Sequence, residues 1–294
     1  MFIIKYKKIF VSISIALVVL SIGAISFFGL NMGIDFKGGS LVEVEYTNVR
    51  PEQSIIEASL KPLAVGQVLI QPIGEKGYSI KARDITDKEH KDILSVLGTD
   101  AVEKSFNSIG PSVGKELARK SIISFILVSL GIIFWIAFSF RKVSKPVSSW
   151  KYGFIAIISL VHDIIIPVGV FAVMSHFSGV EVDTLFVVAV LTILGLSVSD
   201  TIVVFDRIRE NIRMGQFKTF DETVGRSLNQ VFARSIATSS TVIIALLALV
   251  FFGPTSTKIF ALMLTAGMFF GTYSSIFLAS PMLVLVQDMQ KSRK

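Results

Sequence analysis

Long runs of apolar residues dominate the hydrophobic pattern of this chain. A helix needs roughly 20 mostly apolar residues to cross about 30 Å of bilayer hydrocarbon. Six runs reach that length and predict membrane-spanning helices: Ile9–Leu30, Ser121–Phe140, Tyr152–Met174, Thr184–Phe205, Val231–Phe252 and Ile259–Val286. The first run follows three lysines but is longer than the apolar core of a secretory signal peptide. We therefore expect it to remain in the protein as an anchor.

The one long polar segment lies between the first two apolar runs, from about residue 31 to residue 119. Alternation of apolar and polar positions, together with turn signals, predicts four strands, at about 40–47, 67–73, 78–83 and 102–108. A stretch opened by Pro51 and a second begun by the capping box Thr86–Glu89 predict two helices. The resulting order, β-α-β-β-α-β, is that of a ferredoxin-like α+β domain.

Basic residues predict the orientation, since lysine and arginine near helix ends stay on the cytoplasmic side of a membrane. They gather before the first run, in two loops and after the last run: Lys5, Lys7, Lys8, Arg141, Lys142, Lys145, Lys151, Arg207, Arg209, Arg213, Lys218, Arg226, Lys291, Arg293 and Lys294. Both termini are therefore expected in the cytoplasm and the polar domain outside it. This topology accounts for the net charge of +7, so no nucleic-acid partner is expected.

The expected protein is thus an α-helical integral membrane protein with one extracytoplasmic domain. Its parts are the N-terminus with the first helix (1–30), the α+β domain (31–119), five further helices (120–286) and a cytoplasmic tail (287–294). Only 17% of the residues are charged, against about 25% in soluble domains, which agrees with this class. The chain has no cysteine and its three histidines lack metal-ligand spacing, so no disulfide, metal or cofactor is expected.

Four ionisable residues lie inside the apolar runs: His162, Asp163, Asp200 and Arg234. A charge near the bilayer centre costs at least a few kcal/mol, so such residues usually face a bundle interior and have a function. Asp200 lies about 9 Å inside the membrane, and Arg234 lies near the same end of its own helix. We expect these two charges to meet, either as part of a proton path or as a static ion pair that fixes helix packing.

Smaller polar residues surround the expected charge pair. Ser197 and Thr201 share a stripe with Asp200, and Thr238 lies one turn beyond Arg234, which predicts a small hydrated pocket. Asp163 is expected near mid-membrane, with a bend at Pro167 four residues later. The neighbouring His162 is expected either to support this carboxylate or to hydrogen-bond a backbone carbonyl.

Several motifs resemble those of the SecF family, in the same order along almost the whole chain. They are Gly33–Gly39, Ser108–Gly114, Gly195–Asn211 and Arg234–Ser239. Three positions depart from the pattern. Leu196 stands where an aromatic is common, Ser199 where asparagine is common and Ser235 where threonine is common, so the polarity around Asp200 differs somewhat from that of the family.

The resemblance implies a function and several partners. SecF pairs with SecD, a second six-helix half, and both resemble halves of resistance–nodulation–division transporters. The pair associates with the SecYEG channel and, in many bacteria, with YajC in the cytoplasmic membrane, where it uses the proton motive force to pull unfolded preproteins outward. By this analogy Asp200 and Arg234 belong to a proton-conducting set, with Asp163 as a further candidate.

Three functional classes follow from these observations. A proton-coupled subunit of protein export is the first. Half of a proton-driven exporter of small molecules or lipids is the second, although a larger outside domain with a ligand cleft would be expected there. A passive membrane-assembly subunit is the third, and the intramembrane charges argue against it. Enzymatic chemistry is not expected, because the polar segment has no nucleophile–base pair or paired catalytic carboxylates.

Overall fold

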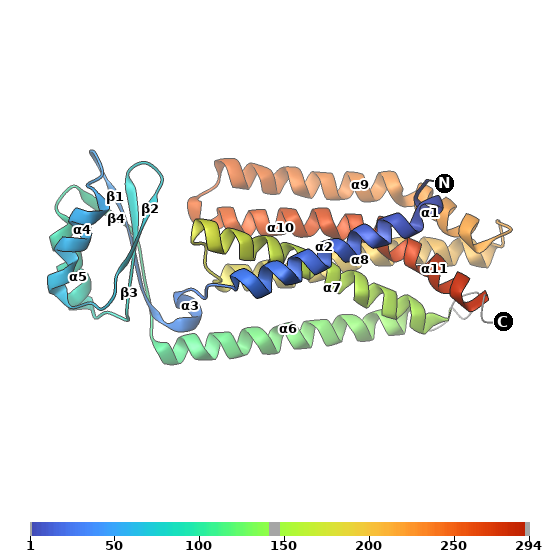
Figure 1. Ribbon diagram of the computed structural model, residues 1–294, viewed down its shortest axis with the longest axis horizontal. Helices are drawn as coiled ribbons and strands as arrows, with labels where there is room; N and C mark the ends of the chain where they lie inside the picture. The colour runs from blue at the N-terminus through green and yellow to red at the C-terminus, as the bar shows by residue number, and fades with distance from the viewer. Residues whose placement is uncertain (1, 141–147, 292–294) are drawn as a thin grey trace. The chain divides into compact units, whose positions relative to one another are not determined.

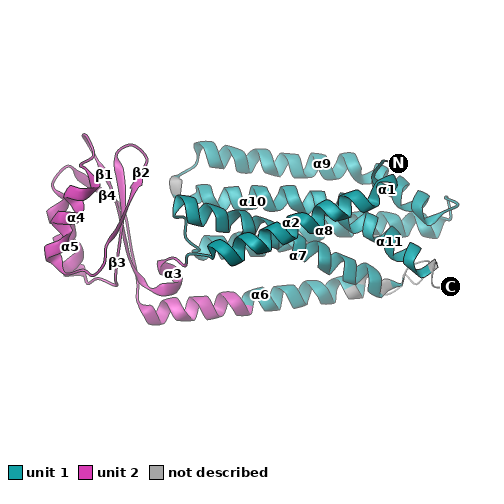
Figure 2. Cartoon of the chain, in the orientation of Figure 1, with its two compact units in different colours: residues 1–31, 124–294 teal, residues 32–123 magenta. Residues whose placement is uncertain are grey.

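The structure, a computed structural model, describes residues 2–140 and 148–291. The chain divides into two compact units, one formed by Met1–Asn31 with Ser124–Lys294 and the other by Met32–Ile123 (Figure 2). Five of the basic residues used to predict the orientation lie outside the described residues: Arg141, Lys142, Lys145, Arg293 and Lys294.

The first unit is helical (Figure 1). Its elements are α1 (Phe2–Lys5), α2 (Lys7–Phe28), the later part of α6 (Pro111–Phe140), α7 (Ser149–Ser178), α8 (Thr184–Met214), α9 (Phe220–Phe252), α10 (Thr255–Ser274), the π-helical turn η2 (Ser275–Ala279) and α11 (Ser280–Lys291). Among the described residues, six helical segments are long and apolar enough to cross a membrane. The six predicted spans are confirmed at this level.

The last span runs continuously from Ser256 to Gln290 and contains the π-helical turn η2. Pro281 follows this turn and has no backbone N–H with which to continue the regular hydrogen-bond ladder. The Ser280 hydroxyl donates instead to the carbonyl of Ser275, five residues earlier, at 3.0 Å. The wider turn therefore lies just before a proline, and the carbonyl of its first residue accepts a hydrogen bond from a side chain.

Small residues allow close contact between the spans. A Cβ atom added at Gly169 in α7 would lie 2.5 Å from the Cβ of Ser21 in α2. One added at Gly267 in α10 would lie 2.2 Å from Cγ1 of Ile193 in α8, and one at Gly271 would lie 3.2 Å from the Cβ of Ser197. Gly267 and Gly271 form a GxxxG pattern, whose usual role in membranes is close helix packing.

Both described ends of the chain lie at one end of the helical unit. The Lys7 ammonium, at the start of α2, donates to Asp221 at the start of α9 (3.1 Å) and to Asp288 near the end of α11 (2.7 Å). The Lys7 side chain is 17% exposed, so these contacts are partly shielded from solvent. An even number of spans brings the termini to the same side, as the sequence predicts.

The second unit contains the short helix α3 (Ile34–Lys37), a four-stranded sheet and two further helices. The elements are β1 (Gly39–Tyr46), α4 (Gln53–Leu60), the 3-10 turn η1 (Lys61–Leu63), β2 (Leu69–Ile73), β3 (Gly77–Ala82), α5 (Asp87–Leu97) and β4 (Ala101–Ile109). The sheet order is β2-β3-β1-β4 with every pair antiparallel. Helices α4 and α5 cover one face of the sheet (Figure 1).

The four strands and two helices that the sequence predicts are all present, in the predicted order. One detail of the prediction is wrong. Pro51 does not open α4, because the helix begins at Gln53 with Glu52 at its N-cap. The carbonyl of Pro51 instead accepts a hydrogen bond from the Tyr78 hydroxyl at 2.7 Å. Proline there fixes an extended approach to the helix.

Two of the glycine-containing motifs pack against each other within this unit. Gly38 has a φ of +79°, and a Cβ there would lie 2.7 Å from the backbone of Pro111 at the start of α6. A Cβ at Gly114 would lie 2.9 Å from the nitrogen of Gly38. The chain therefore enters and leaves the domain at one tightly packed point, which only residues without side chains can form.

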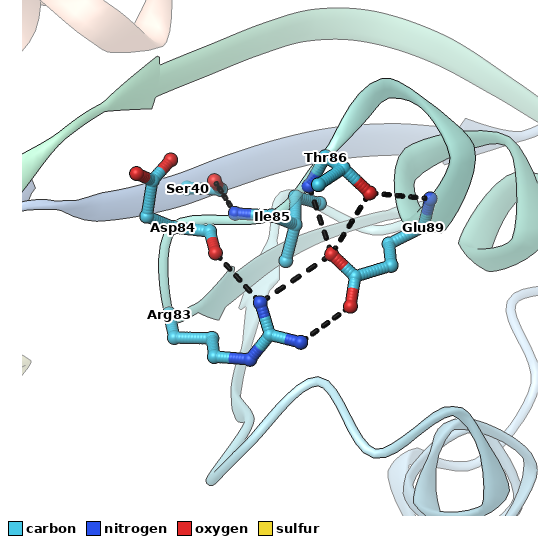
Figure 3. A network of polar contacts seen from close by, with 6 residues as sticks. All are labelled: Ser40, Arg83, Asp84, Ile85, Thr86 and Glu89. Carbon is cyan, nitrogen blue, oxygen red and sulfur yellow. Dashed lines mark hydrogen bonds and ion pairs between the residues drawn. The ribbon is translucent and has the colours of Figure 1, made fainter.

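The capping box of α5 is part of a larger polar network (Figure 3). Thr86 accepts from the Glu89 backbone, while the Glu89 carboxylate accepts from the Thr86 backbone at 2.8 Å and pairs with the Arg83 guanidinium. The Ile85 N–H donates to the Ser40 hydroxyl at 3.1 Å, which ties the start of α5 to strand β1. The Arg83 and Thr86 contacts lower the pKa of Glu89 from 4.5 to about 2.

This lowered pKa predicts an acid-dependent stability of the small domain. The charged form of Glu89 is favoured in the folded state, so its contribution is present above pH 4.5 and is lost as the pH falls toward about 2. Glu89→Gln should lower the thermal midpoint of a 32–123 fragment at neutral pH and flatten its decline between these pH values. Circular dichroism melts would show this, with the exposed Glu57→Gln as control. An unchanged pH profile in Glu89→Gln would contradict the assignment.

Candidate functional site: carboxylates within the spans

Asp163 lies in the middle of α7 and is fully buried, as is His162 beside it. One carboxylate oxygen of Asp163 lies 2.8 Å from Nδ1 of His162. The other accepts hydrogen bonds from the hydroxyls of Ser197 in α8 and Ser274 in α10, the latter at 2.7 Å. Three helices therefore meet at one carboxylate, and both of its oxygens have partners.

The sequence around Asp163 explains how the neighbouring helices reach it. Gly271 has no side chain, so α8 approaches α10 closely at Ser197. Ser159, one turn before Asp163, lies 2.9 Å from the Ser274 hydroxyl and holds it from the side of α7. Pro167, four residues after Asp163, lies within the continuous helix and cannot donate to the Asp163 carbonyl. The carbonyl of Asp163 therefore lacks the backbone hydrogen bond that it would receive in a helix without proline.

Asp200 lies in α8 and is partly buried. Its carboxylate accepts from the Thr272 hydroxyl at 3.2 Å, and the Ser235 hydroxyl of α9 lies beside it. The Thr272 hydroxyl is also 2.5 Å from the hydroxyl of Ser239 in α9. A second carboxylate is therefore held by a hydroxyl group of α10, which itself contacts a hydroxyl group of α9.

A short stretch of α10 connects the two carboxylates. We call Thr272–Ser275 the α10 polar turn: Thr272 contacts Asp200, Ser274 contacts Asp163, and Ser275 lies 3.0 Å from the hydroxyl of Thr201. Its last residue, Ser275, is the first residue of the π-helical turn η2. The two carboxylates therefore share one structural element.

Arg234 does not pair with Asp200, contrary to the expectation from the sequence. Within the described chain no ion pair joins them, and Arg234 lies on an exposed face of α9. The two residues do lie at similar depth in the bundle. Asp200 is about 24 Å from the start of α8, and Arg234 is about 27 Å from the end of α9, which lies on the same side. Arg234 does not point toward Asp200, however. Adjacent residues of a helix point about 100° apart, and on α9 it is Ser235 that faces the interior of the bundle. Residue spacing in the sequence therefore predicted the depth of Arg234 correctly, but not the direction in which its side chain points.

The supporting residues have mixed outcomes. Ser197 is part of a polar site, but it donates to Asp163 rather than lining a pocket at Asp200. Thr201 is buried and contacts Ser275 of the polar turn. Thr238 is exposed, and its hydroxyl donates to the carbonyl of Arg234 at 2.9 Å. His162 pairs with Asp163 rather than with a backbone carbonyl.

The sequence analysis missed Thr272 and Ser274, which donate to the carboxylates, and the hydroxyl residues that surround them: Ser275, Ser235 and Ser239. A usable signal exists, because four consecutive hydroxyl-bearing residues, at positions 272–275, are unusual in the middle of an otherwise apolar span. Residues of this kind hydrogen-bond across helices in membranes.

The described residues contain no group of three or more histidine, cysteine or acidic side chains that could hold a metal ion. What the site offers is two carboxylates that accept from hydroxyl donors and one imidazole that contacts the first carboxylate. Such groups bind and release protons without any cofactor. Ionisable residues in this setting commonly mark proton or ion pathways.

These features define a polytopic membrane protein with a buried carboxylate–hydroxyl site and one small α+β domain. Comparison with known proteins identifies the family. The profile for "Protein export membrane protein SecD/SecF, C-terminal" matches residues 89–289, and the "SecD/SecF GG Motif" matches residues 23–48. The chain belongs to the SecD/SecF family of protein-export membrane proteins.

Individual relatives agree with this assignment. The chain is 40% identical to the protein translocase subunit SecF of Thermobaculum terrenum, over 96% of this chain and 92% of the relative. It is 34% identical to that of Anaerolinea thermophila, over 95% and 92% of the two chains. The crystal structure of SecDF from Thermus thermophilus, described as a translocon-associated membrane protein, superposes with a TM-score of 0.81 at 28% identity. That match covers 97% of this chain and 38% of the larger SecDF chain.

Proposed function

We propose that the chain is the SecF-type subunit of a bacterial Sec protein-export machinery. Together with a SecD-like half, it uses the proton motive force to promote late-stage translocation of preproteins across the cytoplasmic membrane. The relatives named protein translocase subunit SecF, which match over nearly their full length, carry the assignment to export. The buried carboxylates of the helical unit support the proton-coupled part of the proposal.

The structure matches 38% of SecDF, so a partner of comparable or larger size is expected. Arg234 supports a specific place for that partner. An arginine on the outer face of a span is costly in lipid, and such residues normally face protein or water. In the proposed assembly the SecD-like half covers this face of α9 and supplies an acidic or polar partner. Arg234 then belongs to the proton path at the interface between the two halves.

The topology of the proposed assembly follows from the distribution of basic residues. Both termini are cytoplasmic, and the ferredoxin-like domain of residues 31–119 lies outside the cytoplasm. There it binds or guides the emerging unfolded preprotein without catalysing a reaction. SecYEG, with YajC in some bacteria, supplies the channel that this motor serves.

Affinity purification from native membranes tests the proposed assembly. We expect a SecD-like six-helix protein to copurify at a stoichiometric level, with SecYEG at a lower level. Detergent stability of the chain should rise on co-expression with that half, because lipid cannot satisfy the polar groups exposed on α9. An Arg234→Ala variant should lose this gain, whereas Arg226→Ala, a matched change near the start of α9, should keep it. A chain that is equally stable alone would contradict the half-transporter assignment.

A further inference from the structure

The imidazole of His162 has one nitrogen bound and one free. The side chain is 1% exposed, and Nδ1 lies 2.8 Å from the Asp163 carboxylate. The other nitrogen, Nε2, is buried without a hydrogen-bond partner among the described residues, and so is the hydroxyl of Tyr273 in α10. The two rings are stacked, with centroids 6.1 Å apart and planes at 16°. Phe270 adds an apolar wall, with its ring centroid 6.5 Å from that of His162.

Unpaired buried polar groups are uncommon in folded proteins, because burial removes their hydrogen bonds to water without replacing them. Here two such groups lie on rings that face each other, and Pro167 removes the usual donor to the Asp163 carbonyl in the same part of α7. Nε2 of His162 is therefore a buried nitrogen without a hydrogen-bond partner among the described residues, although the other ring nitrogen contacts Asp163.

We propose that His162 and Asp163 form a second proton-binding site, distinct from Asp200, which a water-borne proton enters at Nε2. With Asp163 ionised, Nδ1 carries a hydrogen and donates it to the carboxylate, while the Nε2 lone pair is free. A proton from hydronium bonds to Nε2 and leaves water behind. The Nδ1 hydrogen then moves to the carboxylate, which gives a neutral acid and a neutral imidazole protonated at Nε2. The pair thereby changes its charge from −1 to 0.

This inference rests on the proposed function and adds a consequence for α10. A neutral Asp163 accepts hydrogen bonds more weakly than a charged one. The Ser274 hydroxyl has a second acceptor within reach, the carbonyl of Gly271 at 3.0 Å. Proton uptake therefore shifts Ser274 from the carboxylate toward its own helix, directly before the π-helical turn η2. Through this residue, the charge state of α7 changes the bonding of the α10 polar turn.

Few other charges act on this site. The titratable groups that face it are Asp163 on its own helix, Tyr273 on α10 and, beyond Asp163, Asp200 on α8. The packed helix α2 has no ionisable side chain after Lys8, and α11 contributes Asp288, which is already paired with Lys7. Histidine is the side chain that ordinarily changes charge between about pH 5 and pH 8. A response of His162 can thus be measured without interference from a crowded charge cluster.

Nitrogen-15 NMR of histidine-labelled protein in membranes tests the proposal directly. The chain has three histidines, so comparison with His162→Asn assigns the His162 signals. We expect Nδ1 to stay protonated at neutral pH, and the Nε2 resonance to change reversibly between the shifts of bare and protonated nitrogen as the pH is lowered. An Nε2 resonance that is independent of pH would overturn the proposal.

A second measurement separates a proton role from a packing role. The asparagine amide nitrogen occupies nearly the place of Nδ1, so His162→Asn can keep the hydrogen bond to Asp163 while removing the titratable imidazole. We expect normal folding and partner binding but loss of gradient-dependent export. His176→Asn, on the same helix and in contact with Phe28 and Phe177, should retain it. Full stimulation in His162→Asn would refute the site, whereas no stimulation in the unmodified protein would count against the proposed function and leave the NMR result to decide.

Discussion

Asp200→Asn should abolish the part of preprotein export that depends on a proton gradient, while the chain still inserts, folds and binds its partner half. Asparagine has almost the same size as aspartate, and its amide oxygen can accept the Thr272 hydrogen bond that the carboxylate accepts at 3.2 Å. It cannot take up and release a proton at physiological pH. A packing role would therefore survive the substitution, and a proton-carrying role would not.

The absence of an ion pair to Arg234 sharpens this test. Removing one member of a buried ion pair costs about 3–5 kcal/mol, because the other charge is left without a partner. In the described chain Asp200 accepts from the Thr272 hydroxyl instead, so Asp200→Asn leaves no buried arginine unpaired. We expect a stability loss of about 1 kcal/mol, the usual net value of one hydrogen bond. Inactivity of this variant would then reflect lost proton chemistry and not unfolding.

Asp206→Asn is the matched control. Asp206 lies six residues further along the same helix, and its side chain is 63% exposed. Its Oδ1 lies 3.7 Å from Nε of Arg209, which is a weak surface ion pair. Late-stage export of a preprotein into membrane vesicles, with and without a proton gradient, gives the measurement. Asp206→Asn should keep full gradient stimulation and Asp200→Asn should show none. Normal stimulation by well-folded Asp200→Asn would make this carboxylate structural and leave Asp163 as the proton carrier.

The spans and the sheet could be predicted because they depend on local periodicity. Twenty apolar residues can satisfy their backbone polar groups in a membrane only as a helix, whatever surrounds them. The β-α-β-β-α-β order was readable because its turns and caps are chemically specific, such as the Thr86–Glu89 box at the start of α5. Pro51 was misplaced by two residues, since a proline is equally compatible with the approach to a helix and with its first turn.

The partners of the charged residues could not be predicted, because they depend on how helices face one another. Depth along a span follows from counting residues, and on that basis Asp200 and Arg234 matched. Which direction each points depends on the rotation of α9 against α8 and α10, which placed Ser235 inward and Arg234 outward. The role of Ser274 was equally hidden, since serine in a span commonly bonds its own helix. Here it reaches Asp163 instead.

The second large effect concerns the close packing of α10 against α8 at Gly267 and Ile193. Gly267→Ala should strongly destabilise the helical unit, because the added Cβ would lie 2.2 Å from Cγ1 and 2.4 Å from Cδ1 of Ile193. Ile193 is 2% exposed, so it has no free space into which to move. Overpacking of this kind costs about 1–3 kcal/mol. Separation of α8 from α10 would also weaken the hydrogen bond from Thr272 to Asp200 and the contact between Thr201 and Ser275.

A compensating substitution makes the prediction specific. Ile193→Ala removes the three atoms that lie nearest to the new Cβ, so the double variant should be more stable than Gly267→Ala alone and recover part of the gradient-dependent export. Residues in direct contact show such non-additivity, with coupling energies of about 0.5–3 kcal/mol. Gly195→Ala in α8 is the control, since a Cβ there meets nothing within 4 Å. Thermal unfolding of purified protein in detergent gives the stabilities. Wild-type stability in Gly267→Ala, or additive effects in the double variant, would show that α8 and α10 do not pack through this contact.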